Sequence, residues 1–223
     1  MLPDWLPWLL QVNDAQFPSG AYAHSLGLEE LVQRGVVTTP EHLEAFLHEQ
    51  VLPSLCAFEL PMLAAAHACA VRGDTTGLRA LDDELEAWKL SAELRQASRQ
   101  IGSRRLSLVQ KLDPDPRPKA YAESGAPCHH LIACALELRT LPVAAAACAF
   151  AWQTISGYAT ASMKLMRLGQ ERCQAIVRGA IVAQAPRIEL AVQVPLARAG
   201  WFNPLLEIAS MRHAGARERL FIS

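Results

Sequence analysis

The stretch VAAAACAFAWQTISGYATASMKLMR, residues 143–167, decides the fold class. It carries no charged residue before Lys164 and is long enough to cross a bilayer. Alanine contributes little to membrane insertion, however, and Gln153, Thr154 and Ser156 interrupt the apolar run. Small side chains also leave a smooth surface that neighbouring helices approach closely. We therefore predict the buried central helix of a helical bundle, with no membrane span.

Helical periodicity extends over most of the chain on both sides of this stretch, while hairpin turns and alternating strand patterns are nearly absent. Thr39 and Asp74 are expected N-caps, and prolines are expected to end helices. The predicted helices cover residues 19–35, 40–52, 61–70, 74–112, 128–138, 143–167, 171–184, a short piece between Pro186 and Pro195, and 204–213. Residues 113–118, DPDPRP, are predicted to be a linker.

These patterns predict an all-α, single-domain helical bundle of roughly ten helices. Residues 1–200 are expected to form the bundle, and residues 201–223 a C-terminal helix and tail that bind a partner. The alanine-rich helix also suits a tight self-association surface, so a homodimer is an open expectation.

Composition restricts the class of protein further. The chain has 223 residues, 51% of them hydrophobic, which is enough to fold without disulfides or metal. Its net charge of −1 argues against nucleic-acid binding. The six cysteines include no Cys-x-x-Cys pair, and no signal peptide opens the chain. We therefore expect a cytoplasmic protein with reduced thiols.

The run Cys128-His129-His130 with Cys134 is the best candidate for a metal site. Only His130 and Cys134, four residues apart, would share a helix face. Two ligands make a weak site, so a polar cluster at a helix start is the favoured interpretation, and we assign no metal or cofactor.

Catalytic signals are lacking as well. Ser25 has no evident base and acid partners, and His24, expected inside a helix that begins at Ser19, is interpreted as a core histidine. No phosphate-binding glycine loop occurs. The residues alone predict an interaction protein rather than an enzyme.

The C-terminal stretch WFNPLLEIASMRHAGARERLFIS, residues 201–223, is unusually apolar for a chain end. Leu205, Leu206, Ile208, Leu220 and Phe221 are costly to leave in water. Either the tail folds back on its own domain or a partner buries it.

Several motifs resemble those of one known family, the urease accessory protein UreF family, in collinear order over the whole chain. LLQVNDAQFPSGAYAHSLGLE (residues 9–29) resembles its N-terminal signature, although Ser19 and Ala21 depart from the usual residues there, and Arg167 departs from the usual proline before Leu168. ELPM (59–62), ELR (93–95) with Ser98 and Gly102, KL (164–165) and LGQ (168–170) with Gln174 resemble internal motifs. PLLEIASMRH (204–213) and RLFIS (219–223) resemble its C-terminal pattern.

The resemblance implies an all-α, usually dimeric, non-enzymatic chaperone that bridges UreD (also called UreH) and the GTPase UreG. The assembly then acts on urease apoprotein in nickel insertion. The resemblance also implies that UreD orders the tail and buries Leu220 and Phe221. The predicted partner-binding residues are Pro204, Leu205, Ile208, Ser210, Arg212, His213, Arg219, Leu220, Phe221, Ser223, Lys164, Gln170, His24, Ser25 and Glu29. The alternative function is a nickel-binding carrier that uses His130, Cys134 and their neighbours.

Overall fold

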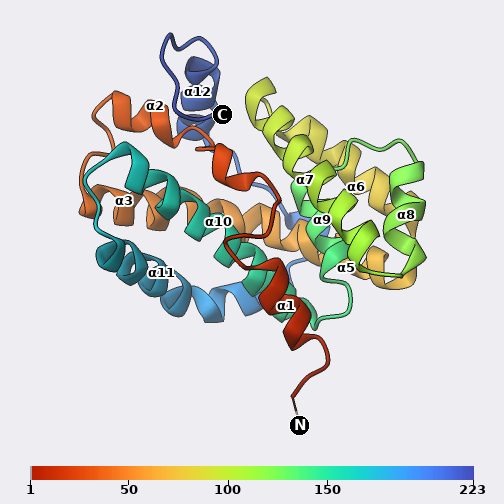
Figure 1. The fold of residues 1–223 in the computed structure, drawn as a ribbon. Helices are drawn as coiled ribbons and strands as arrows, with labels where there is room; N and C mark the ends of the chain where they lie inside the picture. Colours follow the sequence, from red (N-terminus) through yellow and green to blue (C-terminus); the bar gives the residue numbers. More distant parts are fainter. Residues whose placement is uncertain (1) are drawn as a thin grey trace.

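The computed structural model describes residues 2–223 and confirms the all-α class, with no strand in that range (Figure 1). The α-helices are α1 (Leu6–Val12), α2 (Leu28–Gln33), α3 (Pro40–Phe46), α4 (Leu52–Ser54), α5 (Leu60–Arg72), α6 (Thr75–Trp88), α7 (Ala92–Leu112), α8 (Pro116–Glu123), α9 (His130–Glu137), α10 (Val143–Leu165), α11 (Gln170–Ala191) and α12 (Pro204–His213). Two 3-10 helices, η1 (Ala21–Ala23) and η4 (Leu196–Arg198), and two π-helical turns, η2 (Leu47–Val51) and η3 (Leu55–Glu59), complete the list.

The segments α3, η2, α4, η3 and α5 form one continuous helix, which we call the composite helix. The predicted helix end at Pro53 and the predicted helix start at Pro61 are therefore wrong. A proline lacks the N–H of the helix ladder and clashes with the carbonyl four residues earlier. Here each proline follows a π-helical turn, whose wider hydrogen-bond spacing accommodates it. By length and composition alone this 33-residue helix is also apolar enough to cross a membrane. Half of its most apolar window is buried in the protein, and core helices meet the same criteria.

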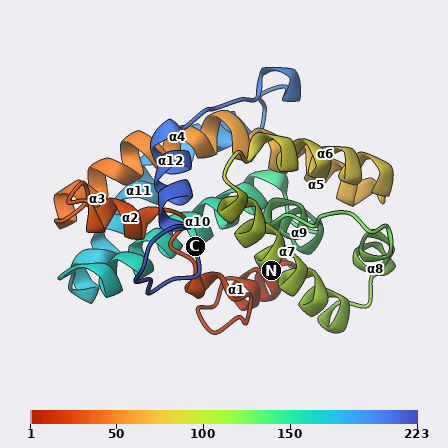
Figure 2. The same ribbon diagram turned by 90° about the horizontal axis from the view of Figure 1, so that it is seen from above.

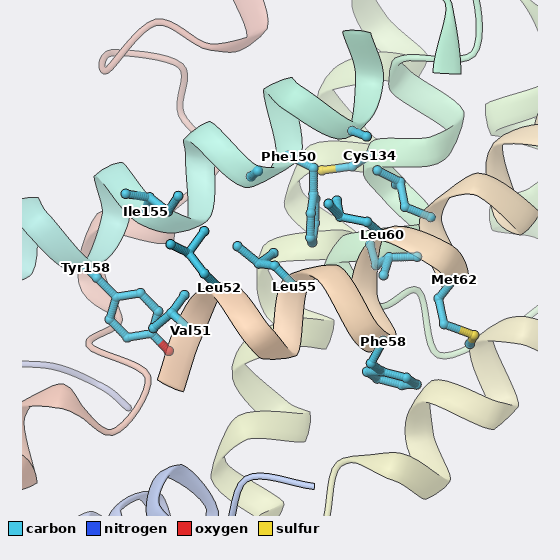
Figure 3. Close-up of a cluster of buried hydrophobic side chains, with 14 of the residues drawn as sticks. Val51, Leu52, Leu55, Phe58, Leu60, Met62, Cys134, Phe150, Ile155 and Tyr158 are labelled. Carbon is cyan, nitrogen blue, oxygen red and sulfur yellow. The ribbon is translucent and has the colours of Figure 1, made fainter. Parts of the chain in front are cut away.

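Helix α10 lies at the centre of the molecule, as its alanine-rich sequence predicts. It contacts α2, α5, α9 and α11, and Figure 2 shows it running beneath the composite helix. Leu52 and Leu55 of the composite helix face Phe150 and Ile155 of α10 in the main core (Figure 3). Small residues on α10 therefore bring its neighbours close, and larger side chains from those neighbours fill the space.

Three other helix boundaries differ from the predictions. The predicted helix over residues 74–112 is two helices, because Arg95 binds the carbonyls of Lys89 and Leu90 and Ser91 caps α7. Helix α8 begins inside the predicted linker, where the Asp115 side chain accepts a hydrogen bond from the Arg117 backbone N–H. Helix α11 continues through the exposed Pro186, since its buried face extends to Ile188 and Ala191.

The predicted helix from Ser19 to Gly35 is also interrupted. After η1 the chain is extended at His24, and Leu26 and Gly27 have positive φ values of 52° and 90° before α2 begins. The backbone of this segment bonds instead to the last residues of the chain, through Ile222 N–H to the Ala23 carbonyl. Tertiary pairing thus replaces the local helix and places His24 and Ser25 beside the C-terminus.

Candidate functional site

Helix α12 lies on α2 and α7, with one face buried and the other exposed. The Asn203 side chain caps its first turn by accepting from Leu206 N–H at 3.3 Å. The φ of 90° at Gly27 favours glycine, and a Cβ there would make van der Waals contact with the Leu206 carbonyl oxygen at 3.4 Å, so α12 packs directly on this turn. Leu205, Ile208 and Met211 are exposed on the outer face. The three residues, spaced by three, form an apolar row that we call the α12 row.

A buried charge cluster fixes α12 to the bundle. His213 Nε2 lies 2.9 Å from Glu29 Oε2 on α2, and its Nδ1 lies 3.0 Å from Glu93 Oε1 on α7. Arg219 adds an ion pair, 3.2 Å from Glu93. The cluster therefore joins α2, α7, α12 and the tail.

Residues 214–223, the C-terminal tail, fold back onto residues 23–29, a segment that we call the tail socket. Glu29 accepts hydrogen bonds from the backbone N–H groups of Leu220 at 2.8 Å and Phe221 at 3.1 Å. Ser223 binds His24 Nδ1 through its hydroxyl at 2.7 Å, and its carbonyl accepts from the Ser25 hydroxyl at 2.9 Å. The tail is thus held mainly by polar contacts to its backbone.

The side chains of the tail alternate between inside and outside. Phe221 is 5% exposed, whereas Leu220 is 73% exposed. Lys164 of α10 lies near the Phe221 ring at 5.2 Å and the Tyr22 ring at 5.8 Å. Of the two alternatives for the tail, this chain by itself shows the fold-back. Phe221, which the resemblance expects a partner to bury, is here buried by its own chain.

The structure brings most predicted site residues together at one end of the molecule. His24, Ser25, Glu29, Lys164, Ser210, His213, Arg219, Phe221 and Ser223 lie in or around the tail socket and the charge cluster. Pro204, Leu205, Ile208, Arg212 and Leu220 are exposed around them, and Gln170 lies apart at the start of α11. The predicted boundary at residue 200 falls between η4 and α12, and the division into two parts stays a prediction.

Sequence reasoning missed Glu93 and Ser91 as members of this site. Glu93 joins His213 and Arg219, and Ser91 bonds through its hydroxyl to Ser210 at 2.8 Å. The only sequence signal for Glu93 is its position at the start of the ELR motif (93–95).

His24 and Ser25 hold the end of the tail. The Ser25 hydroxyl donates to a backbone carbonyl, and His24 meets a hydroxyl of the tail. Burial, together with the charge of Arg104, lowers the pKa of His24. The predicted core histidine agrees with this geometry, although its predicted helix does not.

The Cys-His run forms a structured turn before α9. Asp82 accepts from the backbone N–H groups of Cys128 and His129. Burial lowers the pKa of His130 to about 3 and raises that of Cys134 to about 12. Across residues 2–223, no group of three or more His, Cys, Asp or Glu side chains is placed to hold a metal ion. In the described residues, the nickel site of the alternative function therefore lacks a third ligand beside His130 and Cys134.

Fold and site together define an all-α protein that presents an apolar helix row beside a tail locked onto its own bundle. The chain belongs to the UreF family, whose family model matches residues 37–180. It is 31% identical over 225 residues to urease accessory protein UreF of Paenarthrobacter aurescens, with 96% of each chain covered. It is also 32% identical to the proteins of the same name from Azoarcus sp. (96% of this chain, 94% of the relative) and Azotobacter vinelandii (96% and 97%).

Proposed function

We propose that this protein is a non-enzymatic chaperone of urease maturation. In this role it bridges UreD (UreH) and the GTPase UreG, and the assembly then acts on urease apoprotein to insert nickel. Membership of the UreF family and the name of the relatives, urease accessory protein UreF, support the urease connection. The α12 row supports an adaptor role, since exposed apolar patches on a folded protein mark interaction sites.

The single observation that carries the proposal is the contrast between the two faces of α12. Its inner face is fixed by the contacts of both His213 ring nitrogens with Glu29 and Glu93. Its outer face offers Leu205, Ile208 and Met211 to solvent, with Trp201 and Phe202 exposed just before the helix. A rigid apolar helix face loses little conformational entropy on binding, so it suits a protein partner. We assign this face to UreD.

We further propose that the protein acts as a cytoplasmic homodimer. The cysteines at all six positions are free thiols, which suits a reducing compartment. A groove of about 840 Å³ lies between α1 and the small-residue face of α10, and such smooth surfaces suit close helix packing between two copies.

Coupling between the partners follows from linkage. If UreG binds the assembly better in one nucleotide state, the assembly favours that state by the same free energy. The protein then needs no catalytic group of its own, because binding energy at two faces selects the productive complex.

The test substitutes two residues of the α12 row and leaves the buried contacts of His213 unchanged. Leu205→Asp with Ile208→Asp should abolish co-purification with UreD, while circular dichroism and thermal unfolding stay close to wild type. Val182→Asp, at an exposed apolar position of α11, is the matched control and should retain UreD. Full UreD binding by the double variant would overturn the assignment of this face. Mature urease activity in cells that lack the protein would overturn the proposed function itself.

A further inference from the structure

A small, partly enclosed chamber lies between the composite helix, α6, α7, α9, α10 and the start of α12, and Leu26 of the tail socket forms part of its wall. Its volume is about 150 Å³, room for roughly five water molecules at liquid density. Polar lining residues include Glu59, Ser98, Thr154 and Tyr158. The proposed adaptor function involves the wall residue Trp201 but assigns no role to the interior of the chamber.

Glu59 is a carboxylate of the chamber wall that has no partner. In the described range of residues 2–223, it makes no hydrogen bond and no ion pair within 4.0 Å. Burial raises the pKa of Glu59, and the positive charge of Lys89 at the chamber wall opposes that rise. Tyr158 lines the same chamber, and burial together with the Glu59 charge raises its pKa. A carboxylate so placed requires a counter-ion to stay ionised.

Aromatic rings form much of the remaining wall. They come from Phe58, Trp88, Phe150, Tyr158 and Trp201, and the Phe58 and Trp88 ring centroids are 5.0 Å apart. Aromatic faces attract cations. The Thr154 hydroxyl donates to the Phe150 carbonyl and keeps its lone pairs for an incoming donor.

The other ionisable groups of the chamber wall indicate which kind of ligand the chamber suits. Burial holds the pKa of His130 down at about 3, so its ring is neutral at physiological pH. Glu207 is already used, because it accepts a hydrogen bond from the Ser91 backbone N–H at 2.6 Å. A divalent metal ion prefers several carboxylate or imidazole ligands, and the described side chains provide no such group. A carboxylate, aromatic faces and hydroxyl acceptors instead suit a monovalent cation that carries N–H groups.

We propose that this chamber binds a small ammonium-type cation, such as methylammonium, with Glu59 as its counter-ion and the aromatic rings as its walls. Lys89 competes with the ligand, since it places a second positive charge beside the same carboxylate. Substitution of Glu59 and of Lys89 should therefore change the affinity in opposite directions.

The experiment titrates the intact chain with methylammonium chloride at pH 8 and follows tryptophan fluorescence, because Trp88 and Trp201 line the chamber. Sodium chloride at equal ionic strength is the reference. A saturable change is expected only with methylammonium. Glu59→Gln should raise the Kd at least tenfold, Lys89→Gln should lower it at least twofold, and Glu189→Gln on the exposed side of α11 should leave it unchanged.

Three results would overturn the proposal. The first is an equal response to sodium chloride. The second is an unchanged Kd in Glu59→Gln, whose fold is checked by circular dichroism. The third is a Glu59-dependent response that nickel chloride saturates at lower concentration than methylammonium, which would identify a metal site instead. None of these results depends on urease maturation, so the adaptor function is tested separately.

Discussion

Arg105 and Glu137 form an ion pair inside the bundle, with side chains only 4% and 0% exposed. Arg105 also donates to the Val12 carbonyl at 3.1 Å and lies 5.3 Å from the centre of the Phe17 ring. One guanidinium therefore ties the N-terminal segment to α9. Burial raises the pKa of Glu137, and the charge of Arg105 opposes that rise.

Removal of one partner of this pair should be costly. Arg105→Met leaves a buried carboxylate without its cation, and we expect a loss of about 3–5 kcal/mol in the free energy of unfolding. The double variant Arg105→Met with Glu137→Leu should recover most of that loss, because no charge is then left buried. Urea denaturation of the three proteins measures both effects, and a single variant as stable as wild type would contradict the prediction.

His130 makes the stability of the protein sensitive to acid. Burial lowers its pKa from 6.5 to about 3 in the folded state. Below about pH 6.5, His130 of the unfolded chain binds a proton, whereas His130 of the folded chain stays neutral. The free energy of unfolding therefore falls as the pH drops towards 3. The slope from this one group is at most about 1.4 kcal/mol per pH unit.

His130→Phe keeps an aromatic ring beside Phe150 and removes the titration. The variant should lose less stability than wild type between pH 7 and pH 5, as measured by urea unfolding midpoints at the two pH values. His24, His67 and His129 also have lowered pKa values and should leave a residual slope. An identical slope in variant and wild type would show that the His130 ring titrates freely.

Single residues of the site were partly predictable. The N-terminal and C-terminal motifs contain His24, Glu29 and Arg219, which do lie near one another. Their pairing was not predictable, because contacts between residues about 190 positions apart depend on the tertiary fold. The resemblance implies that UreD buries Phe221, whereas in this chain by itself the ring is buried against its own bundle.

At the scale of helices, two glycines differ in the space that surrounds them. A side chain at Gly102 of α7 would lie 2.0 Å from the Cys128 carbonyl oxygen, so α7 and the start of α9 meet backbone to backbone there. A side chain at Gly157 of α10 would meet nothing within 4 Å.

Gly102→Ala and Gly157→Ala therefore form a matched pair of substitutions in helix interiors. Gly102→Ala should destabilise the protein by about 2 kcal/mol or more, since backbone must move to relieve the clash. Gly157→Ala should stabilise it by about 0.5–1 kcal/mol, because alanine is the better helix former. Thermal unfolding of both variants gives the sign directly, and equal effects would refute the close contact at Gly102.

Capping residues are a reliable signal for helix starts in this chain, whereas proline is a poor signal for helix boundaries. Thr39 and Asp74 cap α3 and α6 as expected, because a cap needs only residues within one turn. Pro53, Pro61 and Pro186 lie within helices, because π-helical turns and the packing of residues beyond the proline offset its cost. The rule that proline interrupts a helix depends only on the local backbone, whereas its exceptions depend on the elements that pack against the helix.

Over the whole molecule, the tail closes the bundle by polar contacts and one buried ring. Phe221→Ala should cost about 3–5 kcal/mol, because a buried aromatic side chain is lost. Leu220→Ala is the control and should change stability by less than about 0.5 kcal/mol, since Leu220 is exposed. Urea unfolding compares the two, and hydrogen exchange at the amides of residues 220–222 should rise only in Phe221→Ala. Equal stability of both variants would mean that the tail does not occupy the socket in solution.

The pairing of Glu29 with residues near the C-terminus has a consequence for protein synthesis. The ribosome makes Glu29 early, and its partner His213 emerges 184 residues later. Until then the nascent chain carries a carboxylate whose partner side chain has not yet been made. Prematurely terminated products would keep that defect, so quality-control proteases have a physical means to distinguish them from finished molecules.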